Sequence, residues 1–243
     1  MISALVQRLQ HFVELSAQDM EVLNSLSQVN QRQLSPEDDL VHEGGPPREP
    51  TIFLSGWGIR YTSLQDGRRQ ILGYFLPGDI ADTNIDVSPV MDHSIAALTK
   101  AIVVEISRET IAGLAETNPN IVKAIQLSKA ASIASLHETI LNLGQRSAVE
   151  RTAHFLCELF VRMKLICLTD ETSCKIAMTR VDIADAIGMT TVHVNRTVKD
   201  LRTAGLLDLE GKTLTIPDLE RLKRAALFNP SYLYLRPGSA KIG

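Results

Sequence analysis

Polar and basic side chains recur in residues 190–199 at a spacing that would place them on one side of a helix. The set comprises Thr190, Thr191, Val192, Asn195, Arg196 and Lys199. Arginine can donate two hydrogen bonds to guanine, asparagine pairs in the same way with adenine, and threonine or valine can touch a thymine methyl group. Lysine can bind backbone phosphates. This combination favours a helix that lies in the major groove of DNA over an ordinary helix with a solvated basic face.

The neighbouring residues predict a helix-turn-helix around this segment. Residues 180–187 show a first helical pattern that would bury Val181, Ile183, Ala184 and Ile187 and turn Asp182 and Asp185 outward. Gly188 can adopt the left-handed conformation that a tight turn demands, and Thr190 is a suitable N-cap for the second helix. The second helix would bury Val194, Val198 and Leu201.

A small wing is predicted directly after the second helix. The segment LLDLEGKTLTI, residues 206–216, has two β-prone runs with a turn at Glu210-Gly211. Such a hairpin completes a winged helix, and Lys212 in the wing can touch a phosphate. Arg180, at the start of the first helix, is a further candidate DNA contact. Upstream we expect a helix over residues 147–163 and a hairpin within ICLTDETSCKIAM, residues 166–178.

Residues 31–106 have the pattern of an antiparallel, jelly-roll-like β-roll. Short β-prone segments alternate with glycine-containing turns, and Asp66-Gly67 joins two of them as a hairpin. Such a roll usually encloses a small pocket, so this part is a candidate sensor domain. Flanking helices are expected over residues 16–29 and 107–115. The predicted fold class is therefore α+β, with a roll in front and a winged helix behind.

A long helix should join the two parts. Asn118-Pro119 provides an N-cap and a proline at the first helical position, and residues 121–143 contain neither proline nor glycine. A stripe on this helix is a candidate dimer interface made of Val122, Ile125, Ser132, Leu136 and Ile140. The alternative is that the helix packs on its own roll. The expected divisions are a roll with helices (1–117), a dimerisation helix (118–144), a winged helix (145–227) and a C-terminal tail (228–243).

The net charge of -3 conceals an uneven distribution. Residues 1–144 carry 10 basic and 17 acidic side chains, whereas residues 145–243 carry 15 basic and 11 acidic ones. We therefore expect only the back half to meet phosphates, with double-stranded DNA as the partner. The N-terminus lacks the apolar core of a signal peptide, and no apolar run approaches about 18 residues. The expected location is the cytoplasm, with no membrane partner.

Other chemistries find little support. Cys157, Cys167 and Cys174 form no CxxC pair, so we predict neither an iron–sulfur cluster nor a metal site, and regard redox sensing as a less favoured alternative to incidental thiols. The sequence has no HxH motif and no recognisable catalytic pairing, so we predict no enzymatic activity. A sensing module that acts through protein contacts is the alternative to a DNA-binding protein.

The order of roll, long helix and winged helix resembles the Crp/Fnr family of bacterial transcription regulators over nearly the whole chain. The segments that carry the resemblance are LSGWGIRYTSLQDGRRQILGYFLPGDI and VDIADAIGMTTVHVNRTVKDLRTAGLL. The resemblance implies a homodimer that binds a two-fold symmetric site, bends the DNA and contacts RNA polymerase. In the family a Glu and an Arg four residues apart commonly read the half-site. Here Arg196 keeps the Arg, but Val192 stands at the Glu position, so the resemblance does not carry over the familiar half-site.

The resemblance also locates a candidate effector pocket, made of Gly78, Asp79, Asp82, His93 and Ser94. No Arg or Lys occurs between Gln70 and Thr99, so the charge of a cyclic nucleotide would lack a partner there. We therefore predict no cofactor, although cyclic nucleotide and haem both stay open. The candidate haem ligands are His93, His42, His11 and Met91. An uncharged or cationic ligand, or none, fits the composition better.

Overall fold

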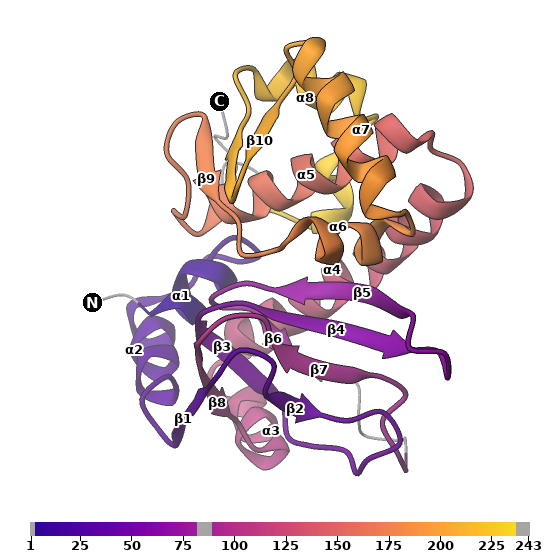
Figure 1. Ribbon diagram of the computed structural model, residues 1–243. Helices are drawn as coiled ribbons and strands as arrows, with labels where there is room; N and C mark the ends of the chain where they lie inside the picture. Colours follow the sequence, from indigo (N-terminus) through magenta and orange to yellow (C-terminus); the bar gives the residue numbers. More distant parts are fainter. Residues whose placement is uncertain (1–2, 82–88, 237–243) are drawn as a thin grey trace.

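The computed structural model of the chain describes residues 3–81 and 89–236 (Figure 1). A β-roll with flanking helices forms the N-terminal part, and a winged helix forms the C-terminal part. One long helix connects them. This arrangement confirms the α+β fold class that the sequence predicts.

Two four-stranded antiparallel sheets form the roll. One has the strand order β1 (Gln31–Leu34), β8 (Ala101–Glu105), β3 (Thr51–Ser55) and β6 (Ile80–Ala81). The other has the order β2 (Asp39–Val41), β7 (Ser94–Ala97), β4 (Gly58–Ser63) and β5 (Arg69–Phe75). The roll buries an apolar core in which the rings of Phe53 and Phe75 stack with centroids 5.3 Å apart. Strands β4 and β5 form the hairpin expected around Gly67, whose φ of 85° suits glycine.

Two helices precede the roll. The sequence predicted only the second, because the six residues of α1 (Ala4–Leu9) are too few to show a clear helical period. α1 buries Leu5, Val6 and Leu9 in the same core cluster as the start of the long helix. α2 (Ala17–Leu26) begins at the expected Ser16 cap, where Asp19 completes a capping box, but it ends before residue 29.

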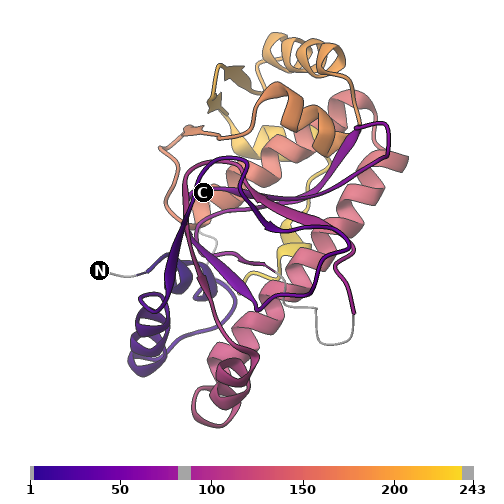
Figure 2. The same ribbon diagram turned by 60° about the horizontal axis from the view of Figure 1, so that its bottom comes forward.

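Helices α3 (Arg108–Thr117) and α4 (Pro119–Gly144) follow the roll. Figure 2 shows α4 running along the roll and onward to the C-terminal part. Pro119 occupies the first turn of α4 as expected, but the Asn118 side chain makes no capping bond. It donates to Asp19 Oδ1 at 2.9 Å instead, and so ties the start of α4 to α2.

The two halves of α4 have different surroundings. In the first half, Ile125 is only 8% exposed and packs in the core with α1 and α2, and Val122 packs against the same cluster. Their assignment to a dimer interface is therefore corrected, because this half of the helix covers its own roll. In the second half, Ile133, Ile140 and Leu143 are 39%, 67% and 39% exposed. An apolar surface remains there.

The C-terminal part is built around α5 (Ala148–Leu165), α6 (Arg180–Ile187), α7 (Thr191–Thr203) and α8 (Leu219–Ala225). Its sheet has the order β10 (Asp208–Glu210), β11 (Thr213–Thr215) and β9 (Ser173–Lys175). The expected wing is confirmed as β10 and β11. The hairpin expected in residues 166–178 is reduced to one bridge between Thr169 and Cys174, because β9 pairs along its length with β11.

Residues 228–236 do not form a loose tail. Phe228 and Leu233 are buried, and the short 3-10 helix η1 (Pro230–Leu233) lies against α4. The backbone N–H of Arg236 donates to the carbonyl of His11 at 2.9 Å. The expected boundary at residue 228 is therefore corrected, since this segment joins the C-terminal core and reaches the N-terminal helices.

Candidate nucleic-acid interface

The turn between α6 and α7 depends on Gly188. Its φ of 63° and ψ of 46° lie in the left-handed region, and a Cβ built there would approach Leu143 Cδ2 to 2.6 Å. Thr190 caps α7 as expected, because its side chain accepts from the His193 N–H. The sequence therefore locates both the turn and the start of the second helix correctly.

The orientation of α6 differs from the expected one. Val181 is 53% exposed, whereas Asp182 is buried. The Asp182 carboxylate accepts from the N–H and hydroxyl of Thr179 in a capping box, and Arg69 of β5 donates to it at 2.7 Å. These polar partners draw Asp182 inward, and a hydrophobic pattern could not anticipate an arginine more than 100 residues away in sequence.

The exposed side of α7 carries the residue types expected for base reading. Thr190, Val192, Asn195, Arg196 and Lys199 are exposed, Val192 by 77%, and Thr191 is half-buried. The opposite side buries Val194, Val198 and Leu201 as predicted. Thr197 is buried too, and its hydroxyl lies 2.9 Å from that of Thr152 on α5. This polar pair, which the sequence analysis missed, fixes α7 on α5.

The two further candidate contacts lie in different settings. Lys212 is exposed at the turn of the wing, where it can reach a phosphate. The half-buried guanidinium of Arg180 donates to the carbonyl of Leu209 in β10. Burial, and then the charge of Arg202, lowers the pKa of Arg180. In this structure Arg180 therefore links α6 to the wing, and its contact with DNA stays a prediction.

The described residues proposed for an effector pocket have different surroundings. Gly78 packs against Ala4 and Arg8 of α1. The Ser94 hydroxyl accepts from the Glu43 N–H at 2.9 Å, and His93 Nδ1 lies 2.6 Å from Asp92 Oδ1. Asp82 lies outside the described residues. These side chains therefore have separate structural partners among the described residues, and the effector pocket stays a prediction.

Asp79 has the most buried setting of this set. Arg8 Nε donates to its Oδ1 at 2.8 Å, and Arg162 of α5 donates to its Oδ2 at 2.6 Å. Burial alone would raise the pKa of Asp79, but the charges of Arg162 and Arg8 outweigh it and lower that pKa. The carboxylate that sequence analysis left without a cation is therefore held by two arginines from other parts of the chain.

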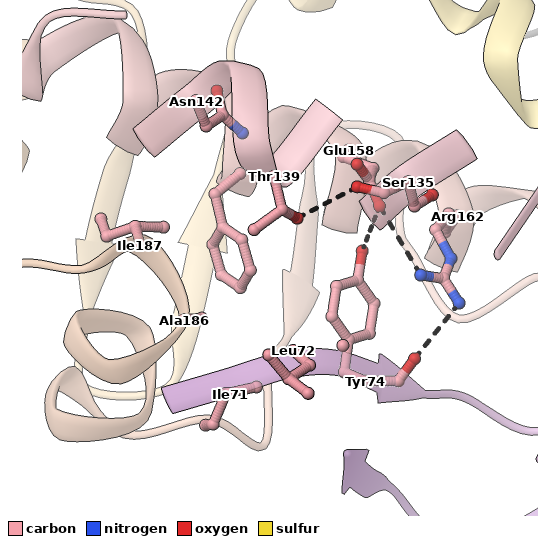
Figure 3. A pocket seen from close by; sticks show the side chains of 12 residues that line it. Ile71, Leu72, Tyr74, Ser135, Thr139, Asn142, Glu158, Arg162, Ala186 and Ile187 are labelled. Atoms are coloured by element: carbon pink, nitrogen blue, oxygen red, sulfur yellow. Dashed lines mark hydrogen bonds and ion pairs between the residues drawn. The ribbon is translucent and has the colours of Figure 1, made fainter. Parts of the chain in front are cut away.

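Glu158 extends this arrangement into the C-terminal part. It accepts from the hydroxyl of Tyr74 at 3.3 Å and lies 3.6 Å from Arg162 Nη1 (Figure 3). It also accepts from the hydroxyl of Tyr232 at 2.7 Å. Arg162 also lies over the Tyr74 ring, 4.3 Å from its centroid. We call Arg8, Asp79, Glu158 and Arg162 the ionic cluster. Two positive and two negative side chains balance in it, so it joins the roll to the winged helix without a net buried charge.

The space beside the ionic cluster is small. A cavity of about 40 Å³ is lined by Arg60, Tyr74, Asp79, Ser132 and Arg162. A second cavity of the same volume lies beside it, and Figure 3 shows the side chains that line it. Each has room for a water molecule rather than a nucleotide. The described residues around these cavities therefore do not fit a cyclic nucleotide.

The thiols and histidines have mostly structural surroundings. Burial raises the pKa of Cys157 and of Cys174 to about 12, which leaves both thiols protonated and unreactive, while Cys167 is exposed. Met91 is buried in the roll core, and His11 Nε2 lies 2.5 Å from the Leu165 carbonyl.

Among the described residues no group of three His, Cys, Asp or Glu side chains could hold a metal ion. Nor does any helix described here have the length and apolar character to cross a membrane.

Known proteins share both parts of the chain. The model of the Crp-like helix-turn-helix domain matches residues 150–225, and that of the cyclic nucleotide-binding domain matches residues 31–118. The nitrogen fixation regulation protein FixK of Azorhizobium caulinodans is 30% identical over 175 residues, which are 71% of this chain and 69% of that protein. The anaerobic regulatory protein of Haemophilus influenzae is 29% identical over 209 residues, 80% of each chain.

A solved structure supports the fold. The structure of FixK2 from Bradyrhizobium japonicum superposes with a TM-score of 0.69 at 24% identity, covering 81% of this chain and 96% of that one. The roll, the winged helix and the exposed side of α7 agree with these similarities. The chain is thus a helix-turn-helix transcription regulator, and it belongs to the Crp/Fnr family.

Proposed function

We propose that this regulator binds a two-fold symmetric DNA site as a homodimer, with α7 of each subunit in a major groove. The observation that carries the proposal is the exposed side of α7, where Asn195, Arg196 and Lys199 stand on a helix fixed by its N-cap and its buried face. It acts in the cytoplasm, on DNA and through RNA polymerase, as the family resemblance implies. Its role is regulation rather than catalysis.

The half-site should differ from that of relatives that carry a Glu at the position of Val192 on α7. An ionised carboxylate accepts from cytosine N4, whereas the isopropyl group of Val192 can only touch a thymine methyl group. Val192 is 77% exposed, so it is available for that contact. Selection of genomic fragments by the full-length protein, with and without cell extract, would reveal the site and the need for an effector. Recovery of fragments without a shared two-fold motif would contradict the proposal.

Arg196→Ala should lose specific binding by about 1–3 kcal/mol and relax one position of the half-site. The reason is that a guanidinium can bind guanine O6 and N7 together, and alanine leaves both acceptors unpaired. Titrations on a library randomised over the half-site would measure this effect. Lys199→Ala is the matched control, because loss of a phosphate contact weakens all sequences about equally. An unchanged site preference in the Arg196 variant would refute its role.

The dimer should form along the second half of α4. Ile140→Glu is expected to convert the dimer to monomers at micromolar concentration, because it places a charge in the exposed apolar surface that Ile133 and Leu143 extend. Sedimentation equilibrium measures the change. Leu227→Glu, at a residue 61% exposed outside α4, is the control and should leave the dimer intact. A dimer that survives Ile140→Glu unchanged would place the interface elsewhere.

We also propose that the effector, if one is used, is not a cyclic nucleotide. The support is the closure of Asp79 into the ionic cluster and the small volume of the cavities beside it. Calorimetric titration of the full-length protein with cyclic AMP and cyclic GMP tests this, and saturable heat at a stoichiometry of one per subunit would contradict it.

A further inference from the structure

An open cleft of about 770 Å³ lies between the β4–β5 hairpin and the helix-turn-helix. Thr62, Leu64 and Arg68 line it from the hairpin side. Thr190, His193 and Arg196 line it from the side of α7. One wall of the cleft therefore belongs to the sensor roll, and the other belongs to the helix that is expected to read DNA.

A double ion pair fixes the distance between these walls. Arg69 Nη2 lies 2.7 Å from Asp182 Oδ1, and Arg69 Nε lies 2.9 Å from Asp185 Oδ2, both on α6. Beside it, Gln70 Nε2 donates to the carbonyl of Ala186 at 3.3 Å. Figure 1 shows α6 directly over β5, in agreement with these contacts. The hairpin is thus attached to the helix-turn-helix as one unit.

With α7 in the major groove as proposed, the cleft would lie on the path of a DNA strand. Thr190, His193 and Arg196 are three residues apart, so they form one edge of the exposed side of α7. A helix with its side chains is about 10–12 Å wide, and the major groove is about 12 Å wide. A helix in the groove therefore has a phosphate strand along each edge. The strand along this edge would run through the cleft, with the hairpin on its other side.

Arg68 is the cation that faces this path from the hairpin. Its side chain is 75% exposed and pairs with Asp66 of its own turn, with Nη2 2.8 Å from Oδ2. Asp66 is 54% exposed, and ion pairs between side chains so open to water are weak. A phosphate can therefore take the guanidinium from Asp66 at little cost. The neighbouring Arg69 is already occupied by two carboxylates and serves to position the hairpin.

We propose that the tip of the β4–β5 hairpin is a second DNA-contacting element, in which Arg68 binds a phosphate of the strand beside α7 of the same subunit. This inference rests on the proposed binding of DNA by α7. It adds a contact from the sensor roll, so the affinity for DNA depends on how the roll and the winged helix are joined.

Arg68→Ala in the full-length protein tests the proposal. Its affinity is measured on the site found by genomic selection and on random DNA of equal length. Each phosphate contact contributes about 0.9 to the slope of log affinity against log salt, so the slope should fall by about that amount. At about 0.1 M salt, affinity should fall roughly 3- to 10-fold on both DNAs. Arg68→Lys should keep the slope. Asp66→Asn should bind more tightly, because it removes a carboxylate that competes for Arg68 and repels phosphate.

Arg32→Ala is the matched control, since Arg32 is an exposed arginine of the same roll that pairs with Glu105 at 3.9 Å. It should change neither affinity nor slope. An unchanged salt slope of the affinity in Arg68→Ala, or tighter binding by this variant, would overturn the inference. Normal DNA binding by Arg68→Ala together with a failure to activate transcription would also overturn it. Absence of specific binding by the wild-type protein would instead refute the proposed function itself.

Discussion

Asp79→Ala is expected to lower the free energy of unfolding by about 3–5 kcal/mol, the usual cost of removing one partner from a buried ion pair. The substitution leaves Arg8 and Arg162 side by side, with side chains only 7% and 11% exposed, and only Glu158 to balance them. The Leu76 N–H also loses its acceptor at 2.8 Å. Urea denaturation of the full-length protein at neutral pH measures the loss.

Asp66→Ala is a suitable control for this experiment. It also removes an aspartate that pairs with an arginine in a turn of the roll, but this pair is exposed and should contribute little to stability. Arg8→Met combined with Asp79→Ala should cost less than the sum of the two single changes, because it removes the positive charge that Asp79→Ala leaves uncompensated. A loss below about 1 kcal/mol for Asp79→Ala would show that the ionic cluster does not stabilise the fold.

The parts of the fold with a strong local pattern followed from the sequence. Gly188 and Thr190 mark a turn and a cap by their own conformational chemistry, so the helix-turn-helix could be placed without knowledge of its surroundings. The Asp66-Gly67 turn fixed the β4–β5 hairpin in the same way. The exposed side of α7 was likewise predictable, because its buried and polar residues alternate with the helical period.

The contacts between the two parts could not be predicted, because they join residues far apart in sequence. Asp79 appeared to be a pocket residue until the structure placed Arg8 and Arg162 beside it. Asp182 was expected outside, but Arg69 binds it. Residues 228–236 looked like a tail because a short segment with little periodicity gives no sign of the surface it will cover. Only tertiary structure identifies these partners.

His154 shows a further interaction that sequence could not reveal. It is fully buried on α5, with its ring 5.3 Å from that of Phe228. Asn142 Oδ1 accepts from Arg146, so the Asn142 amide N–H points to His154 Nδ1 at 3.2 Å, and the neutral ring carries its proton on Nε2. A second proton would have to enter at Nδ1 and would face the amide N–H. Glu138 Oε2 lies 3.3 Å from His154 Nε2, but the same oxygen pairs with Arg146 at 2.9 Å. Burial, and then the charge of Arg146, lowers the pKa of His154 to about 3.

This setting predicts a loss of stability in mild acid. An unfolded histidine takes up its proton near pH 6.5, whereas His154 in the folded protein does so only near pH 3, so between these values the unfolded state binds more protons. The contribution of the neutral His154 ring to the free energy of unfolding is complete above about pH 6.5, and about 3 kcal/mol of it should be lost between about pH 7 and pH 4.

Urea titrations across this range measure the free energy of unfolding, which should fall less steeply with pH for His154→Gln than for the wild type. His137→Gln, on the exposed side of α4, should keep the wild-type slope. Equal slopes for the wild type and the His154 variant would show that His154 is not the group responsible.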